Sequence, residues 1–85
     1  MRLEWTSSAW NDYVWWQDHD RKIVKRINLL IKDVMREPFD AIGKPELLKA
    51  NLSGYWSRRI TDEHRLVYSA TEKAVVIISC RYHYE

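Results

Sequence analysis

VVIIS, residues 75–79, is the most apolar run in the chain, and it leads directly into CRYHYE, residues 80–85. An apolar run bounded by turn residues is typical of a buried strand, so we expect this strand at or near the centre of a sheet. The strand ends in a histidine between two tyrosines, although an unconstrained terminus would simply fray. This ending indicates that the C-terminus has a task of its own.

Two shorter strand patterns precede this run. YWSRRI (55–60) and HRLVYSA (64–70) are separated by TDE, and AVVIISCRYHY (74–84) follows after TEK. Short strand patterns joined by such connections predict three strands in an antiparallel meander.

A long helix is expected before the meander. RKIVKRINLLIKDVMRE (21–37) repeats apolar residues three and four positions apart, with Asp20 as the N-cap candidate and Pro38 as the stop. The apolar stripe consists of Ile23, Ile27, Leu30, Ile31 and Val34.

A shorter helix and one more strand come before it. MRLEW (1–5) alternates and predicts a first strand, after which Thr6, Ser7 or Ser8 can cap a helix. We expect Trp10, Tyr13 and Val14 to form the buried stripe of that helix, widened by Trp15 or Trp16.

Residues 39–54 have no sustained period and contain both glycines, so we expect a loop with a helical turn at 45–50. The element order is then β-α-α-β-β-β, an α+β fold with two N-terminal helices packed on an antiparallel sheet. All of residues 1–85 belong to one domain, because 85 residues suit a single small core.

Composition excludes several classes of protein. One cysteine, Cys80, allows no internal disulfide, and with three scattered histidines it offers no metal-ligand spacing, so we expect neither a metal nor a cofactor. No apolar run approaches the roughly 20 residues that span a bilayer, so we expect a cytoplasmic protein without a membrane partner. A net charge of +2 does not by itself indicate a nucleic-acid partner.

The TDE connection predicts that Arg59 faces Arg65 across two strands. Like charges opposite each other cost stability. One explanation is that both side chains extend into water or pair with Asp62 or Glu63. The other is that they bind a phosphate, which arginine can grip with a bidentate fork.

His83 is the second candidate. A histidine near a terminus is most often surface decoration, yet this one follows the strongest strand and has the charge-switching range of a proton donor or acceptor. A two-residue turn at Glu72 and Lys73 would put Arg65 on the face of Cys80 and Tyr82. A longer turn, a bulge or a bend would bring His83 round to Arg65 instead.

Glu46 and Lys49 lie three residues apart in the loop before the meander. On a helical turn such a pair is usually solvated, but it could also face the surface that carries the arginines. A carboxylate, a histidine and cations around one phosphodiester are the groups needed for acid-base cleavage of RNA through its 2′-hydroxyl.

These residues carry a resemblance. KPELLKANLSGYWSRRITDEHRLVY (44–68) and the terminal CRYHY closely resemble the YoeB toxins of the RelE/ParE superfamily, and the opening LEWTSSAWNDYVWWQ and DRKIVKRINLLIKD (20–33) look like the corresponding parts of that family. The likeness spans essentially the whole chain.

The resemblance implies a ribosome-dependent endoribonuclease that cuts mRNA in the decoding site. It implies Glu46 as general base, His83 as general acid and Arg65 as stabiliser of the transition-state charge. Lys49 and Arg59 match phosphate-binding positions, and Tyr84 matches an aromatic that orients the nucleotide. It further implies inhibition by a YefM-like antitoxin, and such toxins can self-associate as dimers.

Two other functions remain open from the sequence. The chain could be a toxin of the ParE type that inhibits its target without catalysis, or an RNA-binding module that blocks translation and uses its tryptophans and tyrosines as stacking platforms. Most of the five tryptophans are expected to be structural, and Cys80 is expected in the core rather than as a nucleophile.

Overall fold

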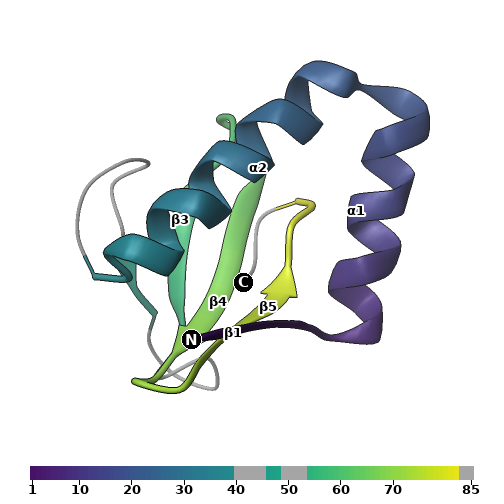
Figure 1. Cartoon of the computed structure of the whole chain (residues 1–85). Coiled ribbons are helices and arrows are strands. Elements are labelled where there is room, and N and C mark those ends of the chain that lie inside the picture. Colours follow the sequence, from purple (N-terminus) through teal and green to yellow (C-terminus); the bar gives the residue numbers. More distant parts are fainter. Residues whose placement is uncertain (40–45, 49–53, 83–85) are drawn as a thin grey trace.

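The computed structural model describes residues 1–39, 46–48 and 54–82. Its elements are β1 (Arg2–Trp5), α1 (Ser7–His19), α2 (Arg21–Arg36), β2 (Glu46–Leu47), β3 (Trp56–Arg59), β4 (Arg65–Ala70) and β5 (Ala74–Ser79). The strands form one sheet in the order β1-β5-β4-β3-β2 (Figure 1). The predicted α+β fold, with two helices before the meander, is confirmed.

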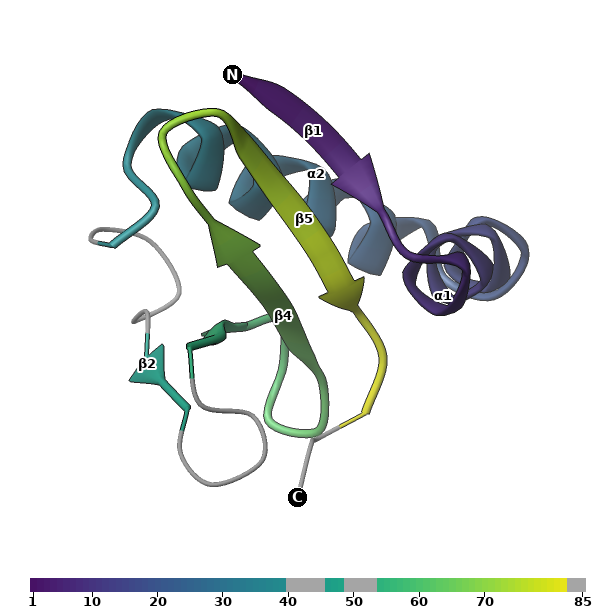
Figure 2. The same ribbon diagram turned by 90° about the horizontal axis from the view of Figure 1, so that it is seen from below.

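The two helices take different places on the sheet. Figure 2 shows α2 lying across one face, while α1 stands beside the edge formed by β1. The core lies between α2 and this face and is built from Ile27, Leu30, Val34, Leu66, Tyr68 and Ile77, among others. In the part of the chain that the structure describes, neither helix has the length and apolar character needed to cross a membrane.

Helix α2 follows the sequence pattern closely. The Asp20 side chain accepts hydrogen bonds from the backbone N–H groups of Lys22 (3.0 Å) and Ile23 (3.4 Å), as an N-cap does. The helix ends at Arg36, two residues before Pro38. Four of the five predicted stripe residues are buried, and the fifth, Ile23, is partly buried.

Helix α1 departs from its prediction. Thr6 is the N-cap and accepts a hydrogen bond from the Ala9 N–H at 3.0 Å. The buried residues are Ala9 and Trp16, whereas Trp10 is 50% exposed and Val14 is also exposed. Trp16 was one of the predicted residues, and Tyr13 packs partly against the core, so the prediction is wrong for Trp10 and Val14 only. Helix α1 contacts α2, β5 and β1, and the sides that carry Trp10 and Val14 stay exposed.

The sheet differs from the prediction in two details. The first is β1, which runs parallel to β5 rather than antiparallel. A tight turn forces neighbouring strands to be antiparallel, but β1 is joined to the meander through two helices and is free of that constraint. The sheet is therefore mixed.

The second detail is β2. Glu46 and Leu47 form a two-residue strand against β3, where a helical turn was predicted over 45–50. The pairing continues as the Leu48 N–H donates to the Tyr55 carbonyl at 2.9 Å. Backbone groups at the edge of β3 gain partners in this way, and that gain outweighs the weak helical preference of a short segment.

Candidate active site

Three of the predicted site residues lie on one face of the sheet. Residues directly opposite each other in neighbouring strands point to the same face, as do residues two apart in one strand. Glu46 is paired with Ser57, and Arg59, two residues further along β3, is paired with Arg65. Arg58 lies between Ser57 and Arg59 in β3, so it points to the opposite face, where its guanidinium donates to Asp33 of α2. Glu46, Arg59 and Arg65 therefore share the face turned away from α2, which we call the site face.

The spacing on the site face suits one bound phosphodiester. Strand β3 separates Glu46 from Arg65, and strand geometry puts their Cα atoms about 12 Å apart. Two long side chains and a phosphate between them can bridge such a distance. Lys49, His83 and Tyr84, the other predicted site residues, lie outside the described residues.

The hairpin between β3 and β4 has the predicted register, with Arg59 opposite Arg65. The Arg59 guanidinium lies 3.4 Å from Asp62 Oδ1, so it is paired within the hairpin as one of the two explanations required. Arg65 donates through Nη1 to the carbonyl oxygens of Thr61, Asp62 and His64.

These contacts hold Arg65 without using up its donors. Among the described residues, its Nε and Nη2 have no protein partner, so one edge of the fork is available to an anion. The two explanations for the arginine pair are therefore compatible: local acceptors offset the repulsion, and the remaining donors can bind a phosphate.

The sequence left open whether the last two strands are joined by a two-residue turn or shifted by a bulge, and the structure has both. Glu72 and Lys73 form a two-residue turn, closed by a 2.9 Å hydrogen bond from Thr71 N–H to the Ala74 carbonyl. A bulge then shifts the pairing between Tyr68 and Val67 by one residue. The side of the sheet on which His83 lies therefore stays a prediction, because residue 83 is outside the described residues.

After β5 ends at Ser79, the chain is held largely by side chains from other elements. The Cys80 N–H donates to Asp12 Oδ2 at 3.1 Å, and the Cys80 carbonyl accepts from Trp16 Nε1 at 2.9 Å. The Tyr82 N–H donates to His64 Nδ1 at 2.7 Å. Sequence reasoning missed these roles of Asp12, Trp16 and His64, because each contact joins residues distant in sequence.

The side chain of Arg81 adds a further attachment to α1. Its guanidinium lies 3.6 Å from the centroid of the Trp15 ring and 4.7 Å from that of Tyr82. Such cation–π contacts contribute about 0.5–2 kcal/mol each, depending on exposure. The segment leading to the C-terminus is thus attached to α1 and to the hairpin together.

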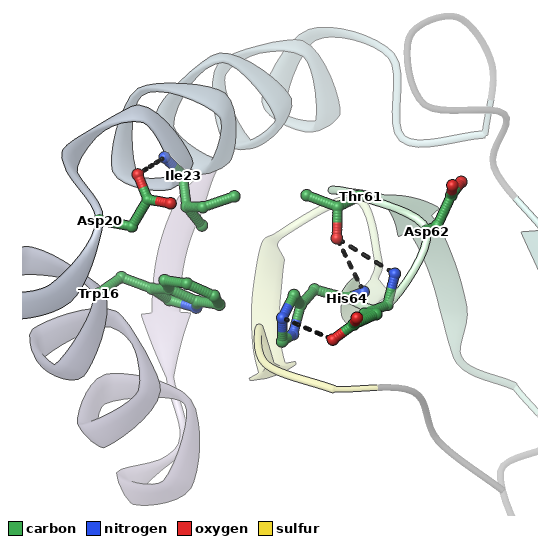
Figure 3. A pocket seen from close by; sticks show the side chains of 7 residues that line it. Trp16, Asp20, Ile23, Thr61, Asp62 and His64 are labelled. Carbon is green, nitrogen blue, oxygen red and sulfur yellow. Dashed lines mark hydrogen bonds and ion pairs between the residues drawn. The ribbon is translucent and has the colours of Figure 1, made fainter.

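A pocket of about 410 Å³ lies between the helices and the hairpin (Figure 3). Trp16, Asp20 and Ile23 line its helical side, and residues 61–64 line the other. Figure 3 shows His64 on the hairpin side facing Trp16, with their rings at 4.7 Å and nearly perpendicular. The pocket lies on the helix side of the sheet, so it is distinct from the site face.

A second feature that sequence reasoning missed is a buried ion pair. Arg58 (0% exposed side chain) and Asp33 (4%) lie 2.6 Å apart, Nη1 to Oδ2. Arg58 also donates to the carbonyl of Glu37 and, through Nε at 3.2 Å, to the Tyr68 hydroxyl. Burial raises the pKa of Tyr68, so this hydroxyl stays protonated. Two features of the sequence could have indicated this ion pair: Arg58 alternates with Arg59 in a strand and so faces the core, and Asp33 lies within the apolar stripe of α2.

Cys80 is fully buried, and its predicted place in the core is confirmed. Burial, with a smaller effect of Asp12, raises the pKa of the Cys80 thiol to about 12. The thiolate is the reactive form, so we expect native protein to resist iodoacetamide at about pH 8, while urea-unfolded protein reacts like a free thiol with a pKa near 8.5. Mass spectrometry of the alkylated fraction over time measures this. Equal rates in the two states would contradict it.

Comparison with solved structures identifies the class. The chain superposes on a YoeB/ParE toxin from Agrobacterium tumefaciens with a TM-score of 0.94 and 50% identity, covering 99% of this chain and 100% of that one. It also matches Staphylococcus aureus YoeB in a structure of the dimer (TM-score 0.92, 47% identity) and in a heterotetrameric complex with YefM (0.90, 47%); each match covers 99% of this chain and 98% of the other. The fold is thus that of a small bacterial toxin of the YoeB/ParE type.

The sequence narrows this class to one family. The chain is 61% identical over 85 residues to a Toxin YoeB from Synechocystis sp., covering 100% of this chain and 99% of the relative. The family described as YoeB-like toxin of bacterial type II toxin-antitoxin system matches residues 5–84. The chain belongs to this family of YoeB-like toxins, which confirms the resemblance found in the sequence.

Proposed function

We propose that this toxin is a ribosome-dependent endoribonuclease that cleaves mRNA in the decoding site and so stops translation in the cytoplasm. The observation that carries the proposal is the site face, where a carboxylate and two guanidinium groups lie on neighbouring strands. The chain leading to His83 passes beside Arg65, since the Arg65 N–H donates to the Tyr82 carbonyl at 3.2 Å.

The proposed reaction uses the 2′-hydroxyl of the RNA as nucleophile. Glu46 removes its proton, and the oxygen attacks the adjacent phosphorus. Arg65 stabilises the negative charge that builds on the phosphoryl oxygens, with Lys49 and Arg59 binding the phosphate and Tyr84 orienting the nucleotide. His83 gives a proton to the departing 5′-oxygen, which leaves a 2′,3′-cyclic phosphate and a new 5′-hydroxyl end.

The same proposal includes two protein partners. Staphylococcus aureus YoeB has been solved as a dimer and in complex with YefM. We propose that this toxin is likewise inhibited by a YefM-like antitoxin and that it self-associates. An acidic antitoxin segment that folds on binding would be attracted to the arginines of the site face.

The experiment that tests the proposal is primer extension on a message translated in vitro with purified toxin. Discrete new ends at fixed codon positions, absent when ribosomes are left out, are expected of a ribosome-dependent nuclease. Arrest of translation without new ends would reject cleavage and favour a toxin that acts by binding alone.

We expect Arg65→Lys to reduce the cleavage rate about 10²- to 10³-fold, the usual loss when one donor to a transition-state charge is removed. Lysine keeps the charge but lacks the planar fork that can hold the hairpin carbonyls and a phosphate at once. The measurement is single-turnover cleavage on saturating programmed ribosomes. Arg2→Lys, a substitution in an exposed pair with Glu4, is the matched control and should cleave normally.

A further inference from the structure

His64 holds the backbone just before the C-terminal residues. Its Nδ1 accepts the Tyr82 N–H at 2.7 Å, and only 13% of its side chain is exposed. A nitrogen that accepts a hydrogen bond carries no proton, so the imidazole is neutral with its proton on Nε2. Nε2 points toward Glu63, whose Oε2 lies 3.9 Å away.

Tyr82 needs such a contact, because its backbone is in an unfavourable conformation. Its φ of 62° lies in the left-handed region, which residues with a Cβ rarely adopt. The residue lies beyond the end of β5, and its N–H is bound by a side chain, His64. The carbonyl of the same residue accepts from Arg65 N–H at 3.2 Å. One hydrogen bond on each side of the Tyr82 Cα therefore holds the backbone of Tyr82 in this conformation.

We propose that His64 is a positioning residue for the C-terminal general acid. Consecutive Cα atoms are 3.80 Å apart, so position 83 is one peptide unit from the atoms that His64 holds, and rotation at Tyr82 would move its side chain by several ångströms. A misplacement of about 1 Å can cost 10²-fold in rate. The inference rests on the proposed function, because it assigns the tail a catalytic role.

If His64 served only to fill space in the packing, any side chain of similar volume could replace it. The ring of His64 meets the edge of Trp16 at 4.7 Å and the ring of Tyr82 at 5.4 Å, and these contacts need only volume. The hydrogen bond needs an acceptor at the place of Nδ1. Asparagine puts its Oδ1 close to that place, whereas leucine fills the volume without an acceptor. His64→Asn and His64→Leu therefore separate positioning from packing.

The test compares these two variants in the full chain. We expect His64→Leu to lower kcat about 10- to 100-fold with KM for programmed ribosomes unchanged, and to speed hydrogen exchange at the Tyr82 amide. His64→Asn should retain most of the wild-type kcat and most of the wild-type protection of the Tyr82 amide. His19→Leu is the matched control, because His19 stacks on Trp15 at 3.8 Å and its Nδ1 lies 2.7 Å from the Trp15 carbonyl oxygen, within the same helix. The control should leave exchange and kcat unchanged.

One measurement needs no variant and no RNA. In ¹⁵N-labelled wild-type protein at about pH 8, a scalar coupling between the Tyr82 amide nitrogen and His64 Nδ1 is expected across the hydrogen bond. Its absence would overturn the inference, as would equal losses of kcat in His64→Asn and His64→Leu, or none in either. Wild-type protein that makes no cuts would instead overturn the proposed function, and the coupling would still show whether His64 holds the tail.

Discussion

Glu46→Ala is expected to slow cleavage of ribosome-bound mRNA by about 10²- to 10⁴-fold, the range that a positioned general base contributes. Glu46 is exposed on the edge strand β2, so its loss removes the base without opening the core. His83→Ala should have an effect of the same order, because the departing oxygen would then lack its acid. Binding to ribosomes should change little, since Lys49, Arg59 and Arg65, the cations proposed to bind the phosphate, are kept in both variants.

Single-turnover primer extension measures the rate, and co-sedimentation with 70S ribosomes measures binding. Glu72→Ala is the matched control for Glu46, since Glu72 is exposed in the turn between β4 and β5 at the other end of the meander. His19→Ala serves in the same way for His83. If both site variants cleaved like wild type, the assignment of base and acid would be wrong.

Arg58→Ala is expected to cost about 3–5 kcal/mol of unfolding free energy, which is typical when one partner of a buried ion pair is removed. The substitution takes one donor each from the Asp33 carboxylate, the Tyr68 hydroxyl and the Glu37 carbonyl. Asp33 then keeps its ion pair with Arg36, whose side chain is exposed, but loses the one with the buried guanidinium. Small domains have only about 5–15 kcal/mol in total. We therefore expect a large shift of the urea midpoint, followed by far-UV circular dichroism.

The neighbouring residue supplies the control. Arg59 is exposed and paired with an exposed carboxylate, so Arg59→Ala should cost less than about 1 kcal/mol. The double variant Arg58→Met with Asp33→Leu should recover much of the loss, because it leaves neither charge unpaired. Equal costs for Arg58→Ala and Arg59→Ala would show that the buried pair has no special weight in stability.

Hydrophobic periodicity predicted the helices and strands with different success. It placed α2 and its stripe correctly, because sixteen residues give the pattern more than four turns in which to repeat. It misplaced the stripe of α1, where aromatic residues occur on several sides, so that Trp10 was expected inside. The helical turn expected over 45–50 rested instead on Pro45, which suits the first position of a helix, and it was wrong for Glu46 and Leu47, because the edge of β3 with which they pair is distant in sequence.

In the candidate site, too, local features could be predicted and contacts between residues distant in sequence could not. The facing of Arg59 and Arg65 was predictable, since a three-residue loop sets which residues are opposite each other. The roles of Arg58 and His64 were not, although they lie next to these arginines in the sequence. Arg58 meets Asp33 across 25 residues, and His64 meets Tyr82 across 18, so neither contact leaves a local pattern.

The sequence by itself determined the order of the elements, the ends of α2, the hairpin that pairs two arginines and the family to which the chain belongs. These properties depend on local periodicity, on short turns and on motifs that can be read along the chain. Only the tertiary structure decided the parallel pairing of β1, the bulge in the last hairpin and the side chains that hold residues 80–82. The physical reason is that these depend on which distant groups remain to satisfy one another once the helices and the meander have packed.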